Sequence, residues 1–150
     1  MIKNERQYRI TRAWAARFAR SVAQLADAPT EADPSDPRLR QIQLDALRSQ
    51  LADLETELAE YEALRSGRRT VLHLASFGDL PEALIKARIA AGLTQRDLAE
   101  RLGLKPQQIQ RYEATDYAAA SLGRVGEVIA ALGIEIREEV LLPERRRESA

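Results

Sequence analysis

The stretch "LTQRDLAERLGLKPQQIQRYE" (Leu93–Glu113) decides the fold of this chain. Its apolar spacing predicts two short helices, at about 95–102 and 106–114, which meet at a tight corner. Gly103 stands at that corner, where a positive φ is needed, and Ala99 is small enough for the two helices to cross closely. A steep crossing over a short turn is typical of a helix-turn-helix motif. The apolar residues expected beneath the two helices are Leu98, Leu102, Leu104, Ile109 and Tyr112.

This stretch resembles the helix-turn-helix of the Cro and phage-repressor (Xre-type) family. The resemblance covers about 80–133 and is most specific over "GLTQRDLAERLG". It implies a lambda-repressor-like bundle in which the helix beginning at Pro106 enters the major groove of double-stranded operator DNA. It also implies that Arg88 and Glu113 form a pair that ties the first helix of the bundle to this recognition helix.

The resemblance assigns DNA contacts residue by residue. Thr94 and Gln95 open the first helix of the motif, where free backbone N–H groups favour a phosphate. Lys105 is expected to reach a phosphate, whereas glutamine and arginine on the second helix can pair with adenine and guanine. The alanine-rich loop "ATDYAAAS" offers only a tyrosine. The predicted DNA-binding residues are Thr94, Gln95, Lys105, Pro106, Gln107, Gln108, Gln110, Arg111 and Tyr117.

The first 66 residues predict a helical arm. One helix is expected from Arg12 to Ala26 with Thr11 as its N-cap, and another from Pro37 to Arg65 with Asp36 as its N-cap. The second helix alternates leucine spacings of three and four, as in a coiled-coil seam. Its charges favour antiparallel packing, either on the first helix as a hairpin or across a dimer, and both arrangements stay open. The residues assigned to a dimer or partner interface are Trp14, Phe18, Leu44, Leu47, Leu51, Leu54, Leu58 and Tyr61.

Two β-rich stretches flank the bundle, at Val71–Ala75 and in "IEIREEVLL" (Ile134–Leu142). We expect them to pair as antiparallel strands, because a lone strand leaves its backbone groups without partners. Between them, Asp79 and Glu82 predict a capping box at the start of a helix, and Ser121 is expected to cap the last helix. The predicted fold class is mainly α. It comprises an N-terminal helical arm or hairpin (1–66), a helix-turn-helix domain with a small two-stranded β element (68–142), and a tail (143–150).

Charge and composition narrow the function further. Lysine plus arginine and aspartate plus glutamate number 23 each, so net charge indicates no partner. The second helix region (29–66) holds nine acidic and four basic residues, which should keep it away from phosphates. Without cysteines or an apolar run near the ~20 residues that span a bilayer, we expect a cytoplasmic protein with no membrane partner. His73 is the single histidine, and no metal-ligand cluster or catalytic motif is present, so we expect no metal, no cofactor and no enzyme activity.

These features predict a DNA-binding transcription regulator, more specifically a repressor that binds as a dimer to half-sites about one helical turn apart. An alternative is an antitoxin that represses its own operon and neutralises a toxin through the arm. A rival of another class is a protein-binding coiled-coil adaptor that does not bind DNA. A steep loss of DNA affinity with rising salt would separate the regulators from the adaptor.

Overall fold

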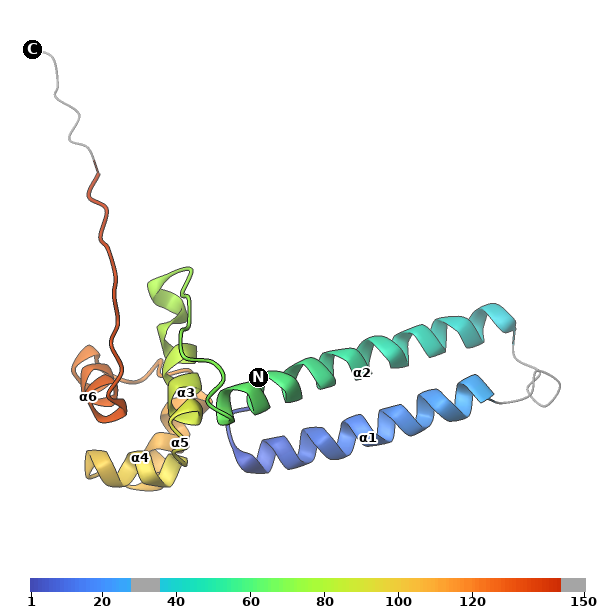
Figure 1. Cartoon of the computed structure of the whole chain (residues 1–150), viewed down its shortest axis with the longest axis horizontal. Helices are drawn as coiled ribbons and strands as arrows, with labels where there is room; N and C mark the ends of the chain where they lie inside the picture. Colours follow the sequence, from blue (N-terminus) through green and yellow to red (C-terminus); the bar gives the residue numbers. More distant parts are fainter. Residues whose placement is uncertain (28–35, 144–150) are drawn as a thin grey trace, which may run out of the picture.

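A computed structural model describes residues 1–27 and 36–143 and shows a long helical hairpin beside a small bundle (Figure 1). The hairpin projects from one side of the bundle, and the N-terminus lies at the junction between them. The hairpin consists of α1 (Glu5–Asp27) and α2 (Pro37–Arg65). The bundle consists of the 3-10 helix η1 (Phe77–Asp79), α3 (Leu80–Ala90), α4 (Gln95–Leu102), α5 (Pro106–Ala114) and α6 (Leu122–Leu132).

Helix α1 begins seven residues before the predicted start, so the assignment of Thr11 as its N-cap was wrong. Asn4 caps the helix instead: its side-chain oxygen accepts a 2.9 Å hydrogen bond from the backbone N–H of Gln7. The inward-facing positions continue back towards this point, through Ala15, Thr11 and Tyr8, which are buried or half-buried. The alternation of three and four is thus present over all of α1 and matches the seam of α2.

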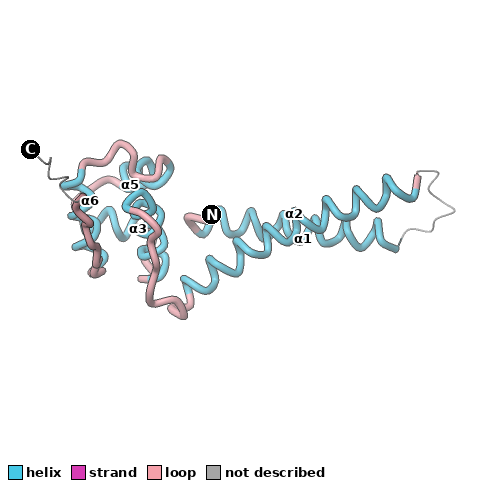
Figure 2. Tube along the Cα trace, turned by 90° about the horizontal axis from the view of Figure 1, so that it is seen from above, coloured by secondary structure: helices cyan, strands magenta, loops and turns pink. Residues whose placement is uncertain are grey.

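The seam of α2 packs against α1 within the same chain, so the hairpin is the arrangement found (Figure 2). Leu44 and Tyr61 are buried, and Tyr61 stacks on Tyr8 with ring centroids 5.0 Å apart. Trp14 lies beside the seam and keeps 47% of its surface exposed, whereas Ala15 is buried in its place. The seam leucines between the two ends, Leu47, Leu51, Leu54 and Leu58, are half-buried in the hairpin.

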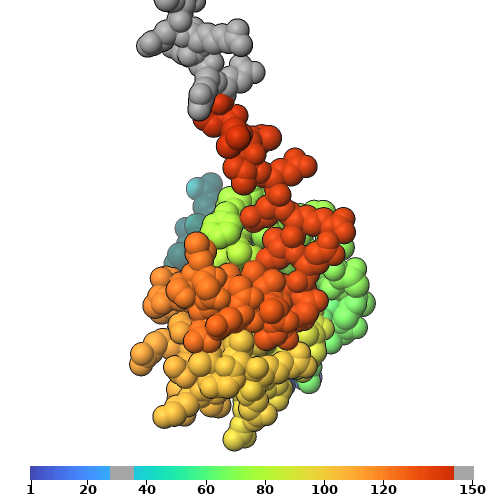
Figure 3. Space-filling view, turned by 90° about the vertical axis from the view of Figure 1, so that its left-hand side faces the viewer, coloured from blue at the N-terminus to red at the C-terminus, as the bar shows by residue number. Residues whose placement is uncertain are grey.

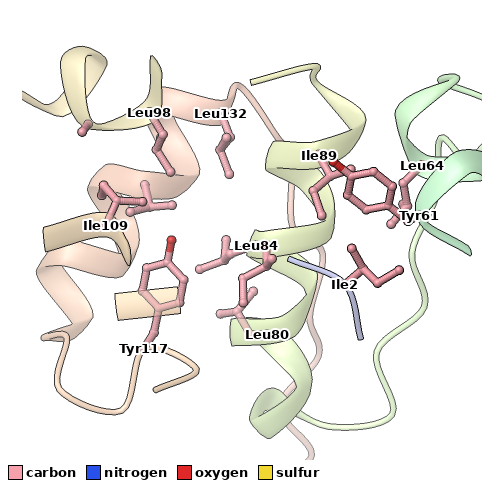
Figure 4. Close-up of a cluster of buried hydrophobic side chains, with 13 residues drawn as sticks. Ile2, Tyr61, Leu64, Leu80, Leu84, Ile89, Leu98, Ile109, Tyr117 and Leu132 are labelled. Carbon is pink, nitrogen blue, oxygen red and sulfur yellow. The ribbon is translucent and has the colours of Figure 1, made fainter. Parts of the chain in front are cut away.

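The hairpin and the bundle share one hydrophobic core (Figure 4). Ile2, from the segment before α1, lies with Tyr61 and Leu64 from the end of α2 against α3. Only 3% of Ile2 and 1% of Leu64 are exposed. The division at residues 66–68 remains a prediction, but apolar packing continues across it. The bundle side of the core is formed by Leu80, Leu84, Ile85, Ile89, Leu98, Ala99, Ile109, Tyr117, Val128 and Leu132.

The start of α3 differs from the predicted capping box. The Asp79 carboxylate does not cap α3. It accepts hydrogen bonds from the backbone N–H groups of Ala75 (3.1 Å) and Ser76 (2.9 Å). Asp79 therefore closes the turn that contains η1, while Pro81 in the first turn suits the start of α3 without a side-chain cap.

The predicted two-stranded β element is absent from the described residues, which contain no strand (Figure 2). The segments 69–75 and 134–142 are extended, but no backbone hydrogen bond joins them. In Figure 1 both run in the same direction, on either side of α3, so the antiparallel pairing that we expected does not form. No helix in 1–27 or 36–143 is long and apolar enough to cross a membrane.

Candidate nucleic-acid interface

Helices α4 and α5 meet at the corner that the sequence predicts. Gly103 takes φ +64°, and the backbone N–H of Leu104 donates a 2.8 Å hydrogen bond to the carbonyl of Ala99. This left-handed turn with a bond back to the last helical turn is the usual helix C-cap built on glycine. Leu98, Ala99 and Ile109 are completely buried beneath the corner. The core therefore fixes the orientation of α5 relative to α4.

One face of α5 is open to solvent. Its buried residues are Ile109 and Glu113, and Pro106 at its start is half-buried. The Gln108 side-chain oxygen accepts a 3.0 Å hydrogen bond from the backbone N–H of Lys105, which stabilises the first turn. In Figure 3 the yellow and orange atoms of α4 and α5 lie together at the lower end of the bundle, away from the tail. The exposed side chains of this region are Lys105, Gln107, Gln108, Gln110 and Arg111.

The start of α4 is closed by its own side chains. The hydroxyl of Thr94 accepts a hydrogen bond from the backbone N–H of Asp97, and the Asp97 carboxylate accepts bonds from the N–H (2.8 Å) and hydroxyl (2.7 Å) of Thr94. These hydrogen bonds lower the pKa of Asp97. Among the described residues, only the backbone N–H groups of Gln95 and Arg96 have no partner at this helix start, so they are the ones available to a phosphate.

The Gln95 side chain points inward. Its amide nitrogen donates a 2.8 Å hydrogen bond to Glu113, which is 0% exposed. Arg88 binds the same carboxylate through two hydrogen bonds, of 2.5 Å from Nε and 2.7 Å from Nη2. The pair between α3 and α5 is thus present as the resemblance implies, and Gln95 links α4 to it. Gln95 is half-buried, and its side chain is engaged with Glu113 of α5.

Lys3 binds the C-terminal end of α5. The sequence did not predict this contact. Its ammonium group donates to the carbonyl of Glu113 (2.7 Å) and to the Asp116 carboxylate (2.8 Å). A cation at a helix C-terminus stabilises the exposed carbonyls there. The carbonyl of Lys3 in turn accepts a 2.6 Å hydrogen bond from Arg88. The only sequence signal for this contact is a lysine beside an apolar residue ahead of α1, which indicates no specific role.

Tyr117 is buried and does not lie on the exposed surface where we expected a DNA contact. The backbone at Asp116 and Tyr117 has positive φ (48° and 57°), which turns the chain back after α5 and directs the tyrosine inward. The ring stacks on Tyr112 with centroids 5.9 Å apart, and 4% of the residue is exposed. Burial raises the pKa of its hydroxyl, which has no hydrogen-bond partner among the described residues.

The comparison with known families agrees with this geometry. Residues 84–138 match a family model described as Helix-turn-helix. No curated protein and no solved structure matches the chain. The matched segment contains α4, Gly103 and α5 together with most of α3 and all of α6. The chain therefore carries an Xre-type, lambda-repressor-like helix-turn-helix domain and is a DNA-binding transcription regulator.

Proposed function

We propose that the protein is a repressor that binds a specific double-stranded DNA site as a dimer, with α5 in the major groove. The observation that carries this proposal is the contrast between the two sides of α5. Ile109 and Glu113 are completely buried, whereas Gln107, Gln108 and Arg111 are exposed on a nine-residue helix. A groove-reading helix needs such a rigid base and polar side chains that point away from the core.

The exposed residues have distinct proposed roles. Gln107 and Arg111 stand four positions apart and therefore on one face of α5, where glutamine can read adenine and arginine can read guanine. Lys105 precedes the helix and supplies a phosphate contact. The N–H groups of Gln95 and Arg96 offer a second phosphate site at the start of α4. We keep Gln108 and Gln110 at the margin of the reading face, and Pro106 as a preformed helix start.

Dimeric binding follows from the small size of the exposed surface. One motif presents a single short helix to the groove, and such modules bind half-sites about one helical turn (roughly 34–36 Å) apart through a two-fold dimer. Repression follows if the occupied site overlaps a promoter. Within the arm, residues 29–66 add no charge attraction for DNA, because they hold nine acidic and four basic side chains.

Salt dependence of binding tests the proposal against the adaptor alternative. The full chain is titrated against labelled duplexes selected from a random pool, at 50 to 200 mM salt, by fluorescence anisotropy. A regulator that neutralises several phosphates should lose affinity steeply, with a linear fall of log K against log salt. The Lys105→Ala variant should show a slope smaller by about one. Affinity that does not depend on salt, or no binding to any duplex, would support the adaptor instead.

A second candidate function rests on the outer face of the hairpin. Ile10 and Trp14 are 48% and 47% exposed and stand four positions apart on α1, and Leu39 and Ile42 are exposed near the start of α2. Arg17 lies over the Trp14 ring at 5.4 Å. An exposed aromatic and aliphatic pair of this kind suits a protein partner, such as a cognate toxin. Co-expression with the product of the neighbouring gene tests this: a complex that Trp14→Ala abolishes supports the antitoxin version, and absence of a complex leaves the operon regulator.

A further inference from the structure

The extended segment 134–142 leaves the bundle with its apolar side chains uncovered. Ile134 and Ile136 are half-buried against the bundle, but Val140, Leu141 and Leu142 are 83%, 89% and 82% exposed. In an extended chain, even-numbered residues share one face. Val140 and Leu142 therefore continue the face of Ile134 and Ile136 beyond the point where the bundle ends. Three consecutive exposed apolar residues indicate a surface that another chain covers.

A groove lies beside this segment. It is lined on one side by residues 69–77, on the other by 133–141, and on its floor by small residues of α3 (Ala83, Ala87 and Ala90). The backbone N–H and C=O groups of 69–74 and 135–142 make no hydrogen bond with any described residue. Two extended edges that face a common groove and run in the same direction are a template for an added strand of opposite direction (Figure 1).

We propose that the occupant of this groove is the 134–142 segment of a second copy of the chain, exchanged reciprocally about a two-fold axis. The argument is the self-complementarity of "IEIREEVLL" when it is paired antiparallel with itself around Glu138. That register sets Arg137 opposite Glu139 of the second copy, twice per dimer. Opposite charges directly across two strands stabilise pairing. The same register pairs apolar residues on the other face, Ile136 with Val140 and Ile134 with Leu142.

The exchange completes a sheet that the single chain lacks. The second copy's segment runs antiparallel to both edges of the groove, which gives four antiparallel strands in the order 69–75, partner segment, own segment, partner 69–75. Val140 and Leu142 then cover the alanine floor of α3 in the other copy. Both backbone edges that face the groove in one chain then acquire a hydrogen-bonding partner. This interface lies apart from α5, so both reading helices stay free.

One contact in this register is unfavourable and provides a sharp test. Glu138 lies on the two-fold axis and meets its own copy, where like charges repel. Replacing Glu138 with Gln should therefore tighten the dimer. Glu135→Gln removes the same charge three residues away, where the register places Leu141 opposite. It serves as the matched control, because it alters only an exposed pair within one chain, the 2.9 Å contact with Arg137, and no contact on the axis. Sedimentation equilibrium without DNA should show a dimer for the full chain, a lower Kd for Glu138→Gln and a smaller change for Glu135→Gln.

Disulfide trapping tests the register directly, because the chain contains no cysteine and any disulfide in a single-cysteine variant joins two copies. Directly opposed residues of an antiparallel pair have Cα atoms about 4.5–5.5 Å apart, within the range of a disulfide. Glu138→Cys should form a covalent dimer rapidly, whereas Glu135→Cys, whose two copies lie six positions apart in this register, should not. Equal rates for both variants, or no dimer for either, would overturn the proposal.

Charge exchange gives a second, independent readout. Arg137→Glu should weaken the dimer about tenfold, since two opposite-charge pairs become like-charge pairs, and so should Glu139→Arg. The double variant should restore wild-type affinity. The inference rests on the proposed dimeric regulator, but dimerisation is measured without DNA. If the variants do not behave as this register predicts but salt-dependent DNA binding is intact, only the proposed interface is overturned. If the chain dimerises in this register but does not bind DNA, only the proposed function is overturned.

Discussion

Arg88 holds Glu113 through two hydrogen bonds, of 2.5 and 2.7 Å, with 2% and 0% of the two residues exposed. The guanidinium also donates to the carbonyls of Leu93 (2.8 Å) and Lys3 (2.6 Å). One side chain therefore joins α3, the start of α4, α5 and the N-terminal segment. The pair therefore fixes the position of α5 relative to α3 and is almost completely buried.

Removal of one member of the Arg88–Glu113 pair should destabilise the fold. Arg88→Met leaves the Glu113 carboxylate buried without its cation, and the free energy of unfolding should fall by about 3–5 kcal/mol. Urea denaturation measures this change. The double variant Arg88→Met with Glu113→Leu replaces both charges by apolar groups and should recover much of the loss. A single variant as stable as the wild type would contradict the role that we assign to the pair.

The N-terminal segment should stabilise the helix-turn-helix domain through Ile2. Ile2→Ala should lower the free energy of unfolding by about 2–5 kcal/mol, because it opens space in the shared core. Ile42→Ala makes the same chemical change where the side chain is 65% exposed, and should cost less than about 0.5 kcal/mol. Equal effects of the two substitutions in urea denaturation would mean that the hairpin and the bundle do not share a core.

The Tyr117→Phe variant distinguishes a role of Tyr117 in the core from a role in DNA contact. Its hydroxyl is buried without a hydrogen-bond partner in the described part of the chain, so Tyr117→Phe removes an unsatisfied polar atom. We expect unchanged DNA affinity and a stability equal to wild type or higher by up to about 1 kcal/mol. Thermal melting and anisotropy titration measure the two quantities. A loss of DNA affinity with unchanged stability would restore the original assignment of this residue.

Asp97 gives the stability a specific pH dependence. Hydrogen bonds from the Thr94 backbone and hydroxyl lower the pKa of Asp97 below its ordinary value of 3.8. Its contribution is therefore present above that value and is lost as the pH falls through the lowered pKa. Asp97→Asn should be less stable than wild type at pH 7, and the two stability curves should converge under acidic conditions. A difference that stays constant down to pH 2 would exclude this mechanism.

The bundle was largely predictable because its signals are local. Gly103 at a left-handed corner, the start of α4 at Thr94 and the apolar spacing of α4 and α5 each depend on residues within one or two turns. The resemblance added the Arg88–Glu113 pair, which spacing alone does not indicate. The exposed positions of Gln107 and Arg111 follow from the same helical period that buries Ile109.

The features that were missed depend on long-range packing. The contact of Lys3 with Glu113 spans 110 positions, and no periodicity marks it. Tyr117 is directed inward by the positive φ of Asp116 and of Tyr117 itself. Neither residue is a glycine, so the sequence does not indicate this turn. The pairing of 71–75 with 134–142 failed because their directions depend on how α3 and α6 pack. Local β propensity correctly indicated extended chain but does not identify its partner.

The central claim is that the exposed face of α5 reads DNA sequence. The most direct measurement is selection of binding sites from random duplexes by the wild type and by Arg111→Ala, with Arg48→Ala on the exposed side of α2 as the matched control. The wild type and Arg48→Ala should enrich the same site, while Arg111→Ala should lose one base preference and about 1–3 kcal/mol of affinity for that site. If Arg111→Ala enriches an identical site with unchanged affinity, α5 does not read the groove in the way proposed.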